Sequence, residues 1–420
     1  MRNLPDGFGI GAAVCSLIED AETKIGEYFR SVQATAEFNQ YKVIDAFRRE
    51  NISPRHFTPT TGYGYSDEGR EALARVFARI TGAQKAVLSP HIAAGTHAIA
   101  AALYCVLRPG DTLISATGAP YDTLRGVISG KGTGSLEDMN VEYREVGLTP
   151  EGGIDAEAAA REIRKCKSPR AVFIQRSRGY AWRPALTLRQ IEEFCRHIKS
   201  LFPEIIIIAD NCYGEFCETR EPTECGADLI AGSMIKNPGG GLAPSGGYIA
   251  GRGDLVALAQ NRLVCPGLGS EVGSYEASYR SFFQGLFIAP HAVSEAMKGA
   301  ILAAKVFESL GYEVCPACGA VRSDITQSVK IGDEKKLLAF MRGIQKASAV
   351  DSAAVPVPWD MPGYGEKIVM AAGTFVQGAS LELTADAPLR PPYIAYFQGG
   401  LTYAHAKLGI MCALSEMGVT

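Results

Sequence analysis

Residues 205–216 of this chain read IIIIADNCYGEF, residues 228–241 read DLIAGSMIKNPGGG, and residues 242–250 read LAPSGGYIA. The β-branched run at 205–209 is typical of a strand buried inside a parallel sheet. Asp210 ends that run, so we expect its carboxylate at the carboxyl edge of the sheet, where open α/β sheets bind ligands. A second apolar run, 229–231, precedes Ser233 and Lys236.

Asp210 and Lys236 supply two of the parts that a pyridoxal phosphate (PLP) site needs. A lysine amine binds the aldehyde of this cofactor, and a carboxylate holds its pyridinium nitrogen protonated. A lone aspartate or lysine is usually a surface charge. Here, however, Asp210 ends a predicted strand that is too apolar to be exposed, and three consecutive glycines, 239–241, follow Lys236 closely in the sequence. The pattern predicts PLP as the cofactor, attached to Lys236.

The chain resembles the fold-type-I PLP enzymes of the cystathionine and methionine γ-lyase group. More closely, it resembles the methionine γ-lyase-like, or aluminium-resistance-protein, family. The resemblance runs from about residue 60 to the C-terminus and rests on motifs that are specific only together. Besides ADNCYGEF and GSMIKNPGGG, these are GYGYSDEGRE (62–71), AAGTHAIAAAL (93–103), RPGD (108–111), TGAPYDTL (117–124), QRSRGY (175–180) and GGLTYAHAKLGI (399–410).

Short buried strands alternate with amphipathic helices up to about residue 265, which predicts a doubly wound α/β sheet. The resemblance implies a mostly parallel seven-stranded sheet flanked by helices, plus a smaller α+β C-terminal domain. We expect an N-terminal helical segment at 1–60, a PLP-binding domain at 61–265 and a small domain at 266–420. In the small domain, the pattern predicts a long helix at 289–310, strands at 325–331, 368–372 and 380–384, and a final helix at 395–417.

The phosphate of the cofactor needs directed hydrogen-bond donors. Gly95 and Thr96 open a helix directly after a predicted strand, so their backbone can approach an anion at the positive end of the helix dipole. Ser233 adds a hydroxyl. His97 could stack on the cofactor or cap the helix, and a lone histidine is more often structural.

The resemblance assigns roles to two tyrosines. Tyr121 matches the tyrosine that γ-lyases stack on the pyridine ring, and its phenol could move protons. Tyr63 or Tyr65 can take the role of a tyrosine that reaches the phosphate of a neighbouring subunit, and Tyr65 aligns better. The arginine that accompanies it in the family is absent, because Asp67 stands there and Arg70 is the nearest substitute. We therefore expect a homo-oligomer, a dimer or tetramer, with a shared active site.

Two arginines are candidates for holding the α-carboxylate of a substrate. Fold-type-I enzymes usually take this group with an arginine from the small domain, for which Arg390 is the candidate. Arg178, at the end of a predicted strand, is the alternative.

Composition sets further limits. The net charge of −3 gives no reason to expect nucleic acid or a membrane surface as partner. No apolar run is long enough to span a bilayer, and the N-terminus shows no signal peptide. Eleven cysteines in a large chain suit reduced thiols in a cytoplasm. Cys315 and Cys318 lack the second pair that a zinc site needs, so we expect no metal.

These observations favour β- or γ-elimination from a sulfur-containing amino acid of the methionine, cystathionine or cysteine type. Transamination and aldol cleavage share the same lysine–aspartate core, so only the resemblance selects the lyase. A non-catalytic regulator with the same fold is a further alternative. A nucleotide-binding enzyme fits poorly, because Gly130-Lys131 lacks the upstream glycine of a P-loop.

Overall fold

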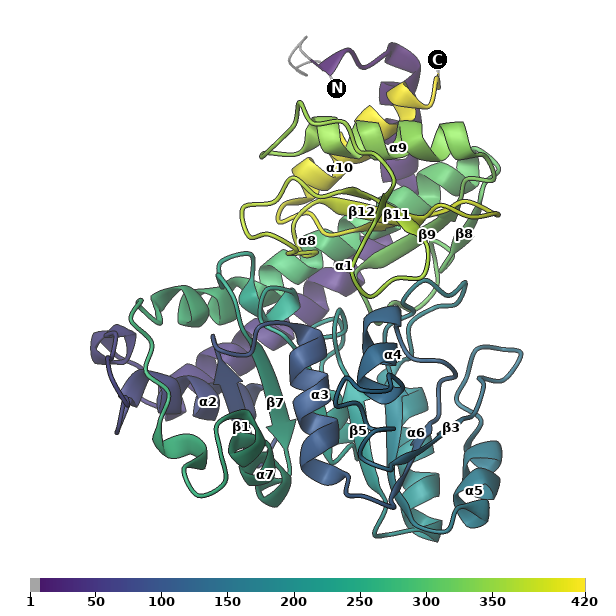
Figure 1. Cartoon of the computed structure of the whole chain (residues 1–420). Coiled ribbons are helices and arrows are strands. Elements are labelled where there is room, and N and C mark those ends of the chain that lie inside the picture. The colour runs from purple at the N-terminus through teal and green to yellow at the C-terminus, as the bar shows by residue number, and fades with distance from the viewer. Residues whose placement is uncertain (1–7, 420) are drawn as a thin grey trace.

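The computed structural model describes residues 8–419. Residues 1–7, where the sequence predicts no signal peptide, and residue 420 lie outside this range. A seven-stranded sheet with the order β1-β7-β6-β5-β4-β2-β3 forms the lower part of the view in Figure 1. All strands run parallel except β7, which is antiparallel to both of its neighbours. The strands are β1 (Lys85–Ser89), β2 (Thr112–Ser115), β3 (Glu142–Glu145), β4 (Pro169–Gln175), β5 (Ile206–Asp210), β6 (Leu229–Ser233) and β7 (Gly247–Gly251).

Helices cover both faces of this sheet, because its strands bury side chains on both sides. In β4, Val172 and Ile174 join one hydrophobic cluster, whereas Ala171 and Phe173 join another on the opposite face. The first face is covered by α2 (Glu68–Ile80), α5 (Ala156–Lys165) and α6 (Leu188–Leu201), and the second by α3 (Gly95–Val106), α4 (Asp122–Ile128) and α7 (Gly253–Leu263). This two-sided burial explains the continuous apolar runs in the sequence.

A second, antiparallel sheet with the order β10-β11-β12-β13-β9-β8 lies above the first in Figure 1, together with α9 and α10. Its elements are β8 (Glu313–Cys315), β9 (Thr326–Lys330), α9 (Glu334–Ala347), β10 (Trp359–Asp360), β11 (Lys367–Ala371), β12 (Thr384–Pro388), β13 (Ile394–Gln398) and α10 (Tyr403–Glu416).

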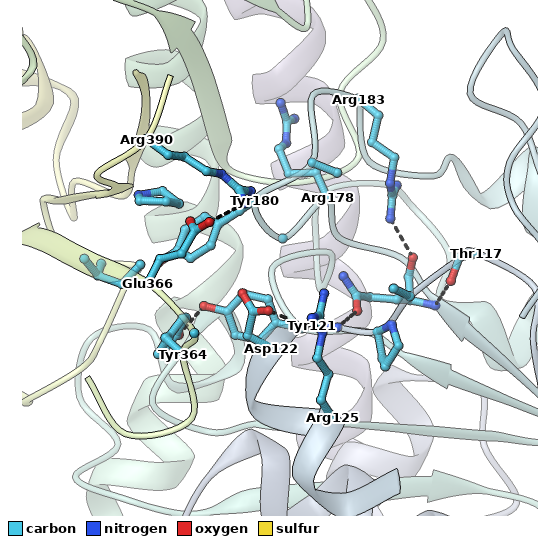
Figure 2. A pocket seen from close by; sticks show the side chains of 18 of the residues that line it. Thr117, Tyr121, Asp122, Arg125, Arg178, Tyr180, Arg183, Tyr364, Glu366 and Arg390 are labelled. Carbon is cyan, nitrogen blue, oxygen red and sulfur yellow. Dashed lines mark hydrogen bonds and ion pairs between the residues drawn. The ribbon is translucent and has the colours of Figure 1, made fainter. Parts of the chain in front are cut away.

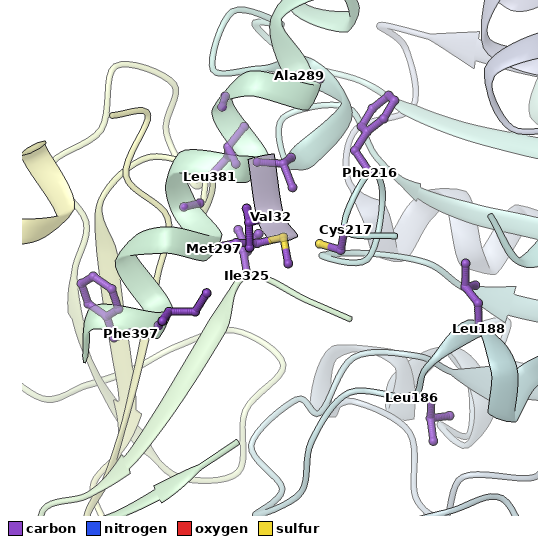
Figure 3. Close-up of a cluster of buried hydrophobic side chains, with 14 of the residues drawn as sticks. Val32, Leu186, Leu188, Phe216, Cys217, Ala289, Met297, Ile325, Leu381 and Phe397 are labelled. Carbon is purple, nitrogen blue, oxygen red and sulfur yellow. The ribbon is translucent and has the colours of Figure 1, made fainter. Parts of the chain in front are cut away.

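Two long helices tie the two sheets together. Helix α1 (Ala12–Arg49) packs along α8 (Arg280–Ser309), and both extend from the lower to the upper part of the molecule (Figure 1). Figure 3 shows Val32 of α1, Met297 of α8 and Phe397 of β13 in one hydrophobic cluster. Because one core crosses both parts, the division at residues 60 and 265 stays a prediction. Across residues 8–419, we find no helix with the length and apolarity needed to cross a membrane.

The chain after residue 265 departs from the prediction at three places. The helix predicted at 395–417 is a strand, β13, followed by α10, because Gly399 and Gly400 adopt φ of 77° and 115° and interrupt the backbone. The strand predicted at 380–384 begins at Thr384 instead. Helix α8 begins nine residues before the predicted start and runs through Pro290, a residue that more often marks a first turn.

Candidate active site

The predicted site residues meet at the carboxyl edge of the large sheet. Asp210 ends β5, Ser233 ends β6, and Lys236 follows three residues later. Gly95 begins α3, and Tyr121 is the N-cap residue of α4. Together with Thr96, these side chains line a cavity of about 270 Å³, which we call the inner cavity. β5 and β6 are neighbours in the sheet, so the acid and the lysine come together through topology.

Asp210 and Lys236 form the charged centre of the inner cavity. Asp210 is buried and accepts a hydrogen bond from the backbone N–H of Cys212 at 3.0 Å. Burial raises the pKa of Asp210, and the Lys236 ammonium opposes that shift. Burial also acts to lower the pKa of Lys236, but the acidic groups of Cys212, Tyr213 and Asp210 outweigh it and raise this pKa.

Tyr213 positions the lysine amine. Its ring centre lies 4.0 Å from Nζ of Lys236. The backbone of Tyr213 has φ of 71°, a left-handed conformation that is uncommon for a bulky residue. Strain of this kind concentrates at functional sites, and here it accompanies the contact between the ring and the amine.

The part of the inner cavity around Gly95 and Ser233 suits a phosphate. The backbone N–H groups at the start of α3 and the hydroxyls of Thr96 and Ser233 are neutral donors. A Cβ atom at Gly95 would lie 3.3 Å from both Sγ of Cys212 and Cβ of Ser233, which explains the glycine. With an acid for the pyridine nitrogen, an amine for the aldehyde and this anion cradle, the residues present fit PLP.

Tyr121 stands at the boundary of a second space. Its hydroxyl is hydrogen-bonded to that of Tyr364, and its ring centre lies 5.7 Å from that of Tyr180 (Figure 2). Its backbone N–H donates to Oε1 of Gln175 at 2.7 Å. Burial raises the pKa of Tyr121 far above its ordinary value.

Beyond Tyr121 lies an outer chamber of about 580 Å³. Its charged and aromatic lining consists of four arginines, two acids and three tyrosines: Arg125, Arg178, Arg183, Arg390, Asp122, Glu366, Tyr121, Tyr180 and Tyr364. Arg390 points into this chamber and pairs with Glu366 at 3.0 Å (Figure 2). Arg183 was not a sequence candidate, and the acceptors of its hydrogen bonds are three backbone carbonyls.

Arg178 lines the outer chamber, but protein groups already hold its guanidinium. Its guanidinium is buried and paired with Asp324 at 3.0 Å, and it also donates to Oγ of Ser328 at 3.2 Å. A third bond goes to the carbonyl of Cys315. Because protein acceptors engage most of its donors, Arg178 joins the two sheets, and Arg390 is the better candidate for binding a carboxylate.

Two other predicted residues lie outside the inner cavity. His97 is exposed, and its Nδ1 accepts a hydrogen bond from the N–H of Ala93, just before the N-cap residue Ala94. Tyr65 is 63% exposed and packs against Tyr63. Arg70 donates from Nη1 to the carbonyls of Gly64 and Gly273, and its role toward a neighbouring subunit stays a prediction.

Sequence reasoning missed Asp386. This buried acid lies in β12 and lines the inner cavity. Its Oδ2 accepts a hydrogen bond from the Tyr180 hydroxyl at 2.6 Å, and its Oδ1 accepts one from Nε2 of Gln398 at 3.1 Å. The available signal was a single acid between two alanines in an apolar segment, TADAP.

Three comparisons relate this chain to known proteins. The family model for methionine gamma-lyase matches residues 14–418. An uncharacterised protein of Bacillus subtilis, YnbB, is 45% identical over 401 residues, which are 95% of each chain. A crystal structure described as a carbon-sulfur lyase involved in aluminium resistance, from Clostridium novyi, has a TM-score of 0.94 and 46% identity, covering 98% of this chain and 97% of the other.

A more distant structure agrees in fold alone. The pyridoxal-5'-phosphate-dependent protein YhfS of Escherichia coli has a TM-score of 0.60 at 16% identity, covering 90% of this chain and 95% of the other. These likenesses confirm the predicted fold class, that of the fold-type-I PLP enzymes.

Proposed function

The chain belongs to the methionine gamma-lyase family, and on that basis we propose that it is a PLP-dependent carbon–sulfur lyase that performs β- or γ-elimination on a sulfur-containing amino acid. The observation that carries this proposal is the inner cavity, in which Lys236, Asp210 and the start of α3 provide an amine, an acid and an anion cradle around one space. The name of the Clostridium novyi relative supports the same class of reaction.

Each residue contributes a separate physical task. PLP, when bound, supplies an electron sink for charge that develops at the substrate Cα. Asp210 would hold the pyridine nitrogen, and the amides of Gly95 and Thr96 with the Ser233 hydroxyl would hold the phosphate. Tyr121 would pack against the ring.

Lys236 then acts as the base. Its amine would take the Cα proton of the substrate, and Tyr213, whose ring lies against Nζ, would keep the amine over the inner cavity. Arg390 would orient the substrate by binding its carboxylate from the outer chamber. We further propose that the protein works in the cytoplasm, since all eleven cysteines are free thiols.

A substrate panel tests the reaction class. We expect at least one of L-methionine, L-cystathionine, L-cysteine and L-homocysteine to yield a 2-oxo acid together with a thiol or sulfide. Tyr121→Phe should lower kcat on that substrate by about 10–100-fold, because the variant retains a stacking ring but loses the phenol. Transfer of the amino group without 2-oxo acid and thiol from any member would exclude the lyase and leave PLP binding intact. No turnover of any kind would favour the regulator.

We also propose a homo-oligomer that shares its active sites. Among the described residues lining the inner cavity, Lys236 is the one cation, so the phosphate end has no positive side chain from its own subunit. Tyr63 and Tyr65 are exposed and stacked, as a segment reaching into a neighbour would be. Light scattering at micromolar concentration should give a dimer or tetramer. A monomer that remains fully loaded with PLP would refute the shared site.

A further inference from the structure

We propose that Asp386 is the acid that protonates the departing sulfur, an inference that rests on the lyase function proposed above. An elimination that breaks a carbon–sulfur bond leaves charge on sulfur, and a positioned acid removes the cost of releasing an alkyl thiolate. Asp210 would hold the pyridine nitrogen. Lys236 becomes protonated once it has taken the Cα proton and is therefore the competing donor; a loss in Asp386→Asn that is selective for a thiolate leaving group distinguishes the two residues.

Asp386 is placed for this role by the packing of the two sheets. It comes from β12 of the small sheet, yet its side chain reaches Tyr180, which belongs to the loop after β4 of the large sheet. Besides the inner cavity, Asp386 and Lys236 both line a narrow passage of about 50 Å³, bounded by Tyr121, Tyr180 and Tyr213. The acid and the base therefore face the same reaction space.

The carboxyl of Asp386 is not neutralised by an ion pair within the described residues. Its two hydrogen bonds come from a phenol and an amide, one to each oxygen, so either oxygen retains a lone pair that can carry a proton. It is only 8% exposed. Glu215 is likewise buried without an ion pair to a described residue, but of the two acids only Asp386 lines the inner cavity.

The surroundings shift the carboxyl toward its protonated form relative to an ordinary aspartate. Burial raises the pKa of Asp386 to about 6, and the Tyr180 hydrogen bond and the Lys236 charge oppose the shift. The titratable side chains that interact with it are Tyr121, Tyr180, Tyr213, Lys236, Tyr364 and Tyr396. Arg178, Asp210 and Cys212 line the same passage. Tyr121 is the weaker donor, because its pKa lies far higher and its hydroxyl is bound to that of Tyr364.

In the proposed step, two residues move protons while the carbon–sulfur bond breaks. Lys236 accepts the proton from the substrate Cα, and the carbon–sulfur bond breaks with its electron pair on sulfur. Asp386 gives its proton to that sulfur, which leaves as a neutral thiol. Lys236 later releases the proton that it took, and water carries a proton back to the Asp386 carboxylate, so both groups return to their starting states.

Two substrates with different leaving groups test the step. S-Ethyl-L-cysteine releases an alkyl thiolate that needs a proton, whereas 3-chloro-L-alanine releases chloride, which does not. We expect Asp386→Asn to lower kcat by about 10²–10⁴-fold on the first substrate and by less than about 10-fold on the second. Equal losses on both would overturn the assignment. If wild-type protein releases 2-oxo acid from neither, the lyase proposal itself fails.

The matched control is Glu215→Gln. Glu215 is also a buried acid, bonded to the Tyr248 hydroxyl at 2.6 Å and with its pKa raised to about 8 by burial, but it lines neither the inner cavity nor the passage. Any loss in this variant should be equal for the two substrates. A loss confined to the thioether would show that removing any buried acid nearby suffices, and would overturn the proposal.

Thermal unfolding of the PLP-free proteins gives a second readout. A carboxyl with a raised pKa favours the folded state below about pH 4, and this contribution is lost as the pH rises through about 6. Asn at 386 can still accept from Tyr180, so Asp386→Asn should melt several degrees higher than wild type at pH 8, with the difference shrinking toward pH 4. A lower Tm at pH 8 would show that Asp386 only joins the sheets, and would contradict the catalytic role.

Discussion

Replacing Lys236 by alanine is expected to abolish elimination, with kcat falling by at least about 10³-fold. The substitution removes both the amine that attaches PLP and the base that takes the Cα proton. No other lysine lines the inner cavity among the described residues, so no neighbour can replace it. Borohydride treatment should fix about one cofactor per chain in wild type and none in Lys236→Ala, as measured by intact-protein mass.

The control for this variant is Lys131→Ala, which changes an exposed lysine in the loop after α4. It should keep both full activity and borohydride-dependent attachment. If the Lys236→Ala protein still carries a reducible cofactor at one equivalent per chain, the attachment site lies elsewhere and the assignment of Lys236 is wrong.

Replacing Arg178 by methionine is expected to lower the free energy of unfolding by about 3–5 kcal/mol. The side chains of Arg178 and Asp324 are each 2% exposed, so the substitution leaves an uncompensated carboxylate in the core. It also removes the bonds to Cys315 and Ser328 that join the large sheet to the small one. Denaturant unfolding measures the loss.

Two variants show whether the loss has this cause. Arg178→Met combined with Asp324→Leu should recover most of the stability, because both members of the buried pair are then apolar. Arg189→Met breaks an exposed pair with Glu193 and should cost under about 1 kcal/mol. If Arg178→Met loses no more than the Arg189 variant, the guanidinium is not part of the core and the preference for Arg390 as the substrate ligand must be revised.

The site residues that could be predicted from the sequence lie at the ends of strands that are neighbours along the chain. The strands β5 and β6 are adjacent in both sequence and sheet. Asp210 ends the first strand, Ser233 ends the second, and Lys236 follows three residues later. Apolar runs mark such strands, and the carboxyl edge of a parallel sheet brings their ends together. Gly95 could be found for a similar reason, since a strand-to-helix turn has a recognisable pattern.

The remaining parts depend on contacts that no spacing reveals. Asp386 reaches the inner cavity only because the small sheet packs on the large one through Tyr180. The partner of Arg178, Asp324, is 146 residues away, so a guanidinium at a strand end was indistinguishable from a ligand-binding one. Short apolar runs such as 394–398 suit a strand or a helix equally, which explains the error at β13.

The product stoichiometry of a single substrate tests the central proposal most directly. Purified protein with PLP would be incubated with the most active member of the panel, and 2-oxo acid, ammonium and thiol would be quantified by NMR over the same time course. The account predicts that the three products form in equal amounts and that Lys236→Ala forms none of them. A 2-oxo acid that still carries its sulfur, formed without ammonium or thiol, would contradict it.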